Sequence, residues 1–128
     1  MKASELRIGN YINRPDLGDG HLRTESILAI YERVKTTGPI KTIFDFQDIH
    51  PIPLTEEWLL KFGFGKSEDH EVGHNTDLNF NFYYDWHFKR FRIESGFNSD
   101  NDWIVPMPHI QYVHQLQNLY FALTGKEL

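Results

Sequence analysis

The sequence predicts a single α+β domain over residues 1–128, built from antiparallel strands, one short helix and one C-terminal amphipathic helix. A chain of 128 residues has the usual size of one domain. Aromatic residues make up 15% of the chain and fall mainly in short alternating runs bounded by Gly, Pro and Asp, which is typical of strands. Towards the C-terminus the apolar residues change to helical spacing.

The first part of the chain favours an antiparallel meander of about three strands, or a small SH3-like barrel. Its pattern predicts a strand over 6–12 with a bend or bulge at Gly9 and Asn10, a loop or hairpin tip over 14–20, a strand over 24–36, a turn at 37–39 and a strand over 40–46. A helix is the alternative over 24–36, because the apolar run there fits both periods.

The clearest local signal predicts a short helix that begins after Thr55. Thr55 can cap the first turn, and the carboxylates of Glu56 and Glu57 lie where the helix dipole favours negative charge. Gly63 supplies the end of the helix. Two turns are too few to be stable alone, so the apolar side chains of this helix must pack on the sheet.

The next part predicts an aromatic β-hairpin. In order, the pattern predicts a polar surface loop over 65–77, a strand in which Leu78, Phe80, Phe82 and Tyr84 share one face, a second strand with Phe91 and Ile93, a loop over 96–102 and a short strand over 103–105. The change of apolar parity requires a turn at 85–87 or a bulge at 89–90, and the turn is favoured.

The closing segment predicts an amphipathic helix over 109–123 that packs on the sheet and ends at Gly125. Its apolar face is marked by Val113, Leu116, Tyr120 and Leu123. Further apolar residues widen this face, which favours either deep burial or a homodimer. His114 lies off the apolar face and is expected to be a solvated or hydrogen-bonded histidine.

Composition narrows the classes of function. Thirteen Lys and Arg against 18 Asp and Glu give a net charge of −5, which disfavours generic binding to nucleic acids or anionic membranes. The absence of cysteine excludes disulfides and thiolate chemistry. Because no membrane-length apolar run or signal-peptide core is present, the expected location is the cytoplasm.

Three segments resemble a small uncharacterised family of gut-type bacteria and their phages. The residues that carry the resemblance are 1–12 (MKASELRIGNYI), 49–64 (IHPIPLTEEWLLKFGF) and 112–125 (YVHQLQNLYFALTG). The resemblance implies a phage or mobile-element accessory protein that acts inside a bacterial cell. It implies no activity and no site residues.

One string has the form of a zinc-protease motif, His70-Glu71-Val72-Gly73-His74. On a helix this spacing places two imidazoles on one face to bind zinc, with the glutamate beside the metal-bound water. The surrounding glycines and polar residues disfavour a helix, and a third histidine is missing where the extended motif requires one. A small zinc-dependent hydrolase is therefore the alternative hypothesis, and we expect no cofactor and no catalytic set.

The basic and aromatic residues between 84 and 92 form the candidate binding site, composed of Tyr84, Trp86, Lys89, Arg90 and Arg92. Aromatic rings beside guanidinium groups can hold anionic groups and stack on planar ones. The same composition also arises from an alternating strand that packs one face only. The resulting hypothesis is a non-enzymatic binding protein, such as an inhibitor or anti-defence factor, that recognises a host protein or a small anionic ligand.

Overall fold

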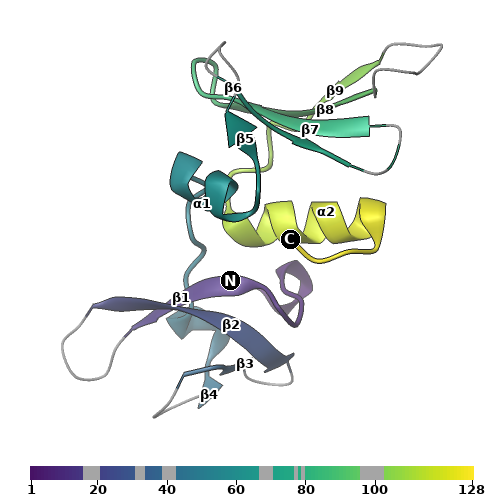
Figure 1. Ribbon diagram of the computed structural model, residues 1–128. Coiled ribbons are helices and arrows are strands. Elements are labelled where there is room, and N and C mark those ends of the chain that lie inside the picture. Colours follow the sequence, from purple (N-terminus) through teal and green to yellow (C-terminus); the bar gives the residue numbers. More distant parts are fainter. Residues whose placement is uncertain are drawn as a thin grey trace. The chain divides into compact units, whose positions relative to one another are not determined.

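The computed structural model confirms the α+β class, with two antiparallel sheets and one long C-terminal helix (Figure 1). It describes residues 1–15, 21–30, 34–38, 43–66, 71–76, 78, 80–95 and 103–128. Residue contacts divide the chain into two compact units. Unit 1 comprises Met1–Pro53 and Tyr112–Glu127, and unit 2 comprises Leu54–Gln111 with Leu128.

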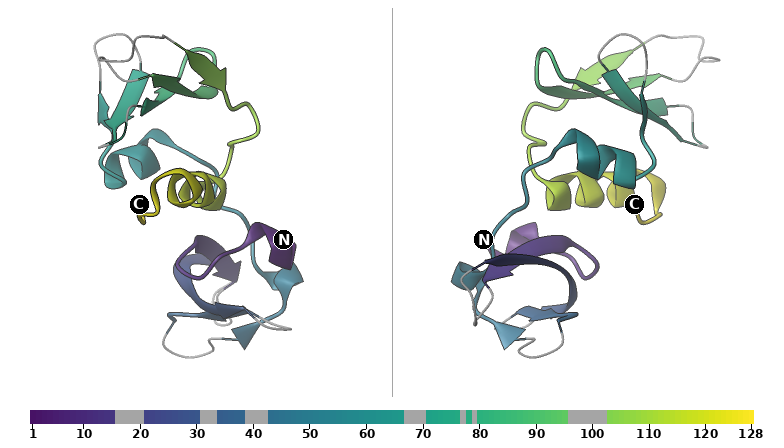
Figure 2. Two further views of the ribbon diagram at one scale, coloured as in Figure 1. Left: turned by 90° about the vertical axis from the view of Figure 1, so that its right-hand side faces the viewer. Right: turned by 60° about the vertical axis from the view of Figure 1, so that its left-hand side comes forward.

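The sheet of unit 1 is an open meander, so the barrel alternative is wrong. Its strands lie in the order β1 (Tyr11–Pro15), β2 (Leu22–Ile30), β3 (Val34–Thr36) and β4 (Ile43–Phe44). The segment predicted as one strand or one helix over 24–36 holds most of β2 and all of β3, which pair with each other, so both the single strand and the single helix are wrong. A register shift between Ile27 and Ala29 marks an irregularity in β2, whose bent course is visible in Figure 2.

The predicted boundaries of the first strand are wrong. The chain forms a 3-10 turn at Ala3–Glu5, and β1 begins only at Tyr11. The side chain of Asn10 accepts a hydrogen bond from the amide of Arg7 at 2.7 Å, which closes a turn where a strand from residue 6 was expected. Strand β1 continues to Pro15 into the predicted loop over 14–20, of which 16–20 lie outside the described residues.

The core cluster of the unit 1 sheet is small and mainly aliphatic. Its buried members are Leu6, Ile12, Ile27, Val34, Phe44 and Ile49, the last of which follows the short 3-10 helix η2 (Phe46–Asp48). After η2 the chain returns to β1, where the backbones of Asn13 and His50 exchange two hydrogen bonds of 3.0 and 2.7 Å. The predicted strand over 40–46 is reduced to β4 within the described residues.

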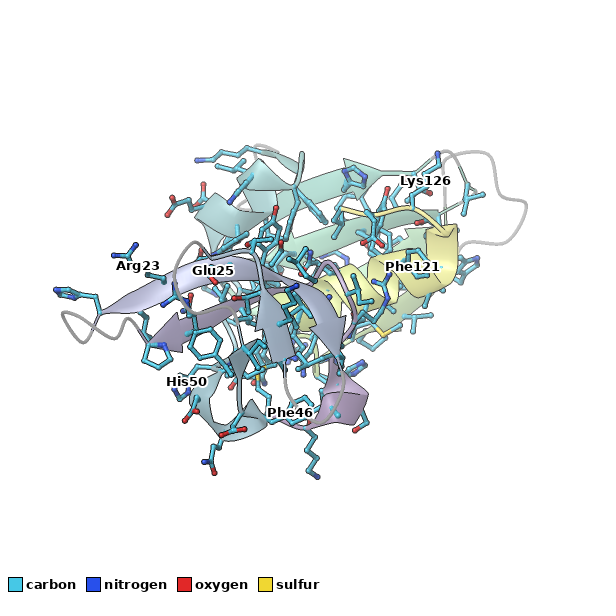
Figure 3. All side chains as sticks on the ribbon, turned by 90° about the horizontal axis from the view of Figure 1, so that it is seen from below. Arg23, Glu25, Phe46, His50, Phe121 and Lys126 are labelled. Atoms are coloured by element: carbon cyan, nitrogen blue, oxygen red, sulfur yellow. The ribbon has the colours of Figure 1, made fainter. Side chains whose placement is uncertain are left out.

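A buried polar cluster built around an ion pair joins three strands of unit 1, and no sequence pattern pointed to it. The guanidinium of Arg14 on β1 donates to the carboxylate of Glu25 on β2 at 2.6 Å, and both residues are over 90% buried. The hydroxyl of Thr36 on β3 donates to the other carboxylate oxygen. Figure 3 shows Glu25 on β2.

This polar cluster determines the charge state of Glu25 and the residue at position 38. Burial alone would raise the pKa of Glu25, but the hydrogen bonds from Arg14 and Thr36, the Arg14 charge and the Gly38 amide together lower it below its ordinary value. A Cβ at Gly38 would lie only 2.1 Å from a carboxylate oxygen of Glu25. Glycine is therefore required there for close approach to the carboxylate.

The C-terminal helix α2 (Val113–Thr124) belongs to unit 1 and contacts β1. Val113, Leu116 and Tyr120 are buried as predicted, and Gly125 ends the helix with a φ of +71°. The helix begins four residues later than predicted, because Tyr112 is extended and pairs with Pro53.

Two polar residues of α2, His114 and Gln117, are buried, although His114 was predicted to lie off the apolar face. The side chain of Gln117 accepts from the amide of Tyr11 at 2.9 Å and donates to the carbonyl of Gly9 at 3.3 Å. His114 stacks on Tyr112, and its Nδ1 has no hydrogen-bond partner among the described residues. Its burial lowers the pKa of the imidazole, although the charge of Glu5 opposes this.

Unit 2 begins with the predicted short helix, α1 (Glu56–Lys61). The hydroxyl of Thr55 accepts from the amide of Trp58 at 3.4 Å, and Gly63 follows the helix with a φ of +84°. Leu59 is fully buried. The predicted N-cap at Thr55, the predicted end at Gly63 and the packing of the apolar face through Leu59 are all confirmed.

The sheet of unit 2 has five antiparallel strands in sequence order: β5 (Gly65–Lys66), β6 (Glu71–Asn75), β7 (Phe80–Asp85), β8 (Arg90–Ser95) and β9 (Ile104–Pro106). The predicted loop over 65–77 is wrong, because pairing with β7 makes β6 a strand despite its weak propensity. The predicted hairpin is confirmed as β7 and β8 with a turn at 86–89, and the bulge alternative is wrong. The predicted loop over 96–102 lies outside the described residues.

One face of this sheet is an aromatic core. Phe82, Tyr84, Phe91 and Ile93 are buried, as the alternation predicts, and ring contacts link Phe91 to Phe82 and Phe64 at 5.8 and 6.4 Å. Leu78 precedes the strand and is exposed. Among the described residues, no helix has the length and hydropathy needed to cross a membrane.

Candidate functional site

The β7–β8 hairpin separates the five residues that the sequence groups as one binding site. Strand alternation places Tyr84 on the buried face, beside Phe91. Arg90 and Arg92 follow the opposite parity and point to the outer face of the sheet. Trp86 and Lys89 belong to the turn between the strands. The structure thus brings Lys89 and Arg90 together and leaves Tyr84 in the core.

The turn is fixed by a local hydrogen bond. The carboxylate of Asp85 accepts from the amide of Phe88, three residues on, at 3.0 Å, and this bond closes the turn. Lys89 then takes a φ of +50°, a conformation uncommon for a residue with a side chain. Because Asp85 also closes the strand pair with Arg90, the turn presents its side chains from a defined backbone.

The exposed ring of the turn belongs to Phe88, which is not among the five residues predicted from the sequence. Its side chain is 60% exposed. The ring of His87 approaches it edge-on at 4.8 Å, and the guanidinium of Arg90 lies 5.4 Å from its centroid. A large exposed apolar side chain beside a cation is a signal that only the structure gives, because alternation fails inside a turn.

The two cations of the turn are exposed, and neither Lys89 nor Arg90 forms an ion pair with any residue that the structure describes. The nearest acidic residue in the strand pairing is Asp85, which lies opposite Arg90. Arg92 differs, since it is paired with Glu94 and lies 5.0 Å over the ring of Tyr83. We call His87, Phe88, Lys89 and Arg90 the cationic turn.

Tyr84 and Trp86 are the more buried residues next to the cationic turn. Their rings are 4.3 Å apart, and Trp86 is half-buried. The indole N–H of Trp86 is buried without a hydrogen-bond partner among the described residues. Burial, followed by the charge of Asp85, raises the pKa of Tyr84, so its hydroxyl is neutral at physiological pH. Both residues are therefore structural neighbours of the exposed groups.

The zinc-motif segment is not helical where it is described. Glu71 and His74 belong to β6, and His70 lies outside the described residues. The ring of His74 packs 5.0 Å from Phe64. The described part of the chain holds no group of three His, Asp or Glu side chains arranged to bind a metal. As the composition of the segment indicated, the helix that a zinc-protease motif requires is not formed at 71–74. The zinc-dependent hydrolase stays an untested alternative hypothesis.

A second exposed surface lies at the edge of the same sheet, on strand β9. Ile104, Val105 and Pro106 are all exposed, with Ile104 at 64%. We call these three residues the apolar edge. The amide of Met107 donates to the carbonyl of Phe91 at 2.7 Å and Ser95 donates to Trp103 at 3.0 Å, so odd-numbered residues bond to β8. The backbone groups of Ile104 and Pro106 therefore point away from the sheet.

Pro106 limits what the apolar edge can pair with. Proline has no N–H, so the free side of β9 offers one donor, that of Ile104. We expect Pro106→Val to restore the second donor and raise β-propensity, causing self-association through this edge. Sedimentation velocity over a concentration series measures this, with Pro108→Val as the control outside the strand. Association of Pro106→Val no stronger than that of the wild type contradicts the assignment.

No protein-family model, curated protein or solved structure matches this chain. The candidate site is accordingly defined by its own geometry: a cationic turn with an exposed ring, held at the end of a paired hairpin.

Proposed function

We propose that the protein is a non-enzymatic binding protein that recognises an acidic segment of another protein through the cationic turn. The observation that carries the proposal is the exposed ring of Phe88 beside two exposed cations that form no ion pair among the described residues, all on a hydrogen-bonded turn. Arginine and aromatic side chains are enriched where proteins recognise one another, although lysine is not.

A protein partner is favoured over a small anionic ligand. A small ligand is usually held in a concave site that covers most of its surface. The four residues from His87 to Arg90 include no buried side chain, so they protrude and provide no such enclosure. The net charge of −5 disfavours nucleic acid as the partner, because a long polyanion meets the negative charge of the whole chain. A short acidic segment contacts mainly the cations of the turn, since salt screens charges more than about 10 Å away.

The cellular context of the proposal comes from the resemblance of three segments to a phage-associated family. An accessory protein of a phage or mobile element acts on the host cell, and the partner is then a host protein in the cytoplasm. An inhibitor or anti-defence factor would need a surface for binding and no reaction centre. The cationic turn is such a surface.

Charge reversal at the turn tests the proposal. We expect a tetraglutamate peptide to shift the backbone amide NMR signals of residues 86–90, with an affinity that falls as salt is added. Arg90→Glu should weaken this binding at least tenfold, because it replaces an attractive charge by a repulsive one.

Lys35→Glu is the matched control, since Lys35 is an exposed cation on β3 and its reversal changes the net charge by the same amount. It should leave the titration nearly unchanged. Equal losses in Arg90→Glu and Lys35→Glu would show that only net charge matters, and unshifted signals at 86–90 would refute the assignment of the site. Inorganic phosphate binding more tightly than the peptide would favour a small anion.

Self-association through α2 is a second, independent proposal about partners. Phe121 and Leu123 are exposed on this helix, although the guanidinium of Arg7 covers one face of the Phe121 ring at 3.8 Å. Figure 3 shows Phe121 on α2. The apolar exposure supports a homodimer, which sedimentation of the wild type at low concentration tests.

A further inference from the structure

Arg90 of the cationic turn and two residues of the apolar edge, Ile104 and Pro106, lie on the same face of one sheet, whereas Val105 pairs with the buried Ile93 and lies on the other face. Arg90, Arg92 and Glu94 alternate along β8 and share its outer face. Ile104 pairs with Glu94 and Pro106 pairs with Arg92, so both point to that face as well. Arg90 and Ile104 therefore belong to one continuous surface of unit 2.

The spacing between the two groups is set by the strand. Arg90 and Glu94 are four residues apart on β8, which corresponds to about 13 Å. The part between them is electrically balanced, because Arg92 is paired with Glu94. The surface thus offers a positive charge at one end, a neutral centre and an exposed aliphatic side chain at the other end.

Resting on the function proposed above, we infer that the partner presents an extended segment with a carboxylate at one position and a bulky apolar side chain four residues away. In an extended chain, residues i and i+4 lie on the same side and about 13 Å apart. This is close to the separation of Arg90 and Ile104, which is about 14 Å because Ile104 lies opposite Glu94 on the neighbouring strand, about 5 Å away. A small anion cannot reach both groups. The carboxylate pairs with Arg90, and the apolar side chain covers Ile104.

The edge strand restricts how this segment binds. Because Pro106 removes one of the outward donors, addition of a full strand to β9 is disfavoured. Recognition therefore depends on the side chains of the outer face. This makes the binding sensitive to the identity of the two terminal side chains of the segment.

Two peptides that differ at one position test the inference. The probes are acetyl-Glu-Ser-Thr-Ser-Leu-amide and acetyl-Glu-Ser-Thr-Ser-Ser-amide, titrated into the isotope-labelled full chain and followed by the amide signals of Arg90 and Ile104. We expect the first peptide to shift both signals and the second to shift only that of Arg90. The first peptide should bind about tenfold more tightly, as expected for partial burial of two aliphatic side chains.

Variants separate the two claims. Ile104→Ser should reduce the affinity for the leucine peptide to that of the serine peptide, while Ile43→Ser, the same change at an exposed position on β4, should not. Equal affinities of the two peptides with an Arg90 shift would overturn this inference and leave the cationic turn as a binding site. No shift at Arg90 with either peptide would overturn the proposed function itself.

Discussion

Replacing Arg14 by methionine should reduce the free energy of unfolding by about 3–5 kcal/mol. The substitution leaves the carboxylate of Glu25 buried without its counter-ion, and removal of one partner from a buried pair has a cost of this size. Since small domains have total stabilities of about 5–15 kcal/mol, this is a large fraction of the whole. Urea denaturation followed by circular dichroism measures the loss.

A double-mutant cycle identifies the ion pair as the cause. Glu25→Gln also destabilises, because it leaves the buried guanidinium without a carboxylate. The double variant Arg14→Met, Glu25→Gln should lose clearly less stability than the sum of the two single losses, since no charge remains buried. Arg23→Met removes an arginine from an exposed position on β2 (Figure 3) and should change stability by no more than about 0.5 kcal/mol.

The same pair gives stability a defined pH dependence. The folded state lowers the pKa of Glu25, so the unfolded chain binds more protons than the folded chain in the acid range. The contribution of Glu25 is fully present above the ordinary carboxyl pKa and is lost as the pH falls through the lowered value. Glu25→Gln should flatten the acid limb of the stability curve. An additive cycle with an unchanged acid limb would contradict the coupling.

The second large effect is expected in the aromatic core of unit 2. Phe91 is 1% exposed and its ring contacts Phe82 and Phe64, so Phe91→Ala should cost about 3–5 kcal/mol through lost burial and an unfilled cavity. Thermal and urea unfolding measure the change. The amide NMR signals of unit 2 should lose chemical-shift dispersion at the same time.

Phe88→Ala is the matched control, because the same ring is removed three residues earlier along the chain. Phe88 is 60% exposed in the cationic turn, and its loss should change stability by about 0.5 kcal/mol or less. It should nevertheless weaken binding of the tetraglutamate peptide by removing the ring beside Arg90. If both variants lost stability equally, Phe88 would be part of the core and the cationic turn would not be a free surface.

The amino-acid sequence alone determined the features that depend on near neighbours in the chain. The α1 cap at Thr55, the end of α2 at Gly125 and the alternation of Phe82, Tyr84, Phe91 and Ile93 were all predicted correctly. Each rests on spacings of a few residues: a side chain that reaches the next turn, a glycine that permits a positive φ, or a two-residue period with one buried face. The hairpin followed from the same parity.

Tertiary structure decided the features that require residues distant in sequence to meet. Strand β6 forms because β7 supplies its hydrogen bonds. Gln117 can be buried because its side-chain oxygen accepts a hydrogen bond from the amide of Tyr11. The Arg14–Glu25 pair joins two strands whose charges give no periodic signal. In the turn, backbone geometry and not alternation exposes Phe88 and sends Trp86 inward. The physical reason is the same in each case: burial of a polar group or exposure of an apolar one is set by its three-dimensional partners, which local periodicity does not encode.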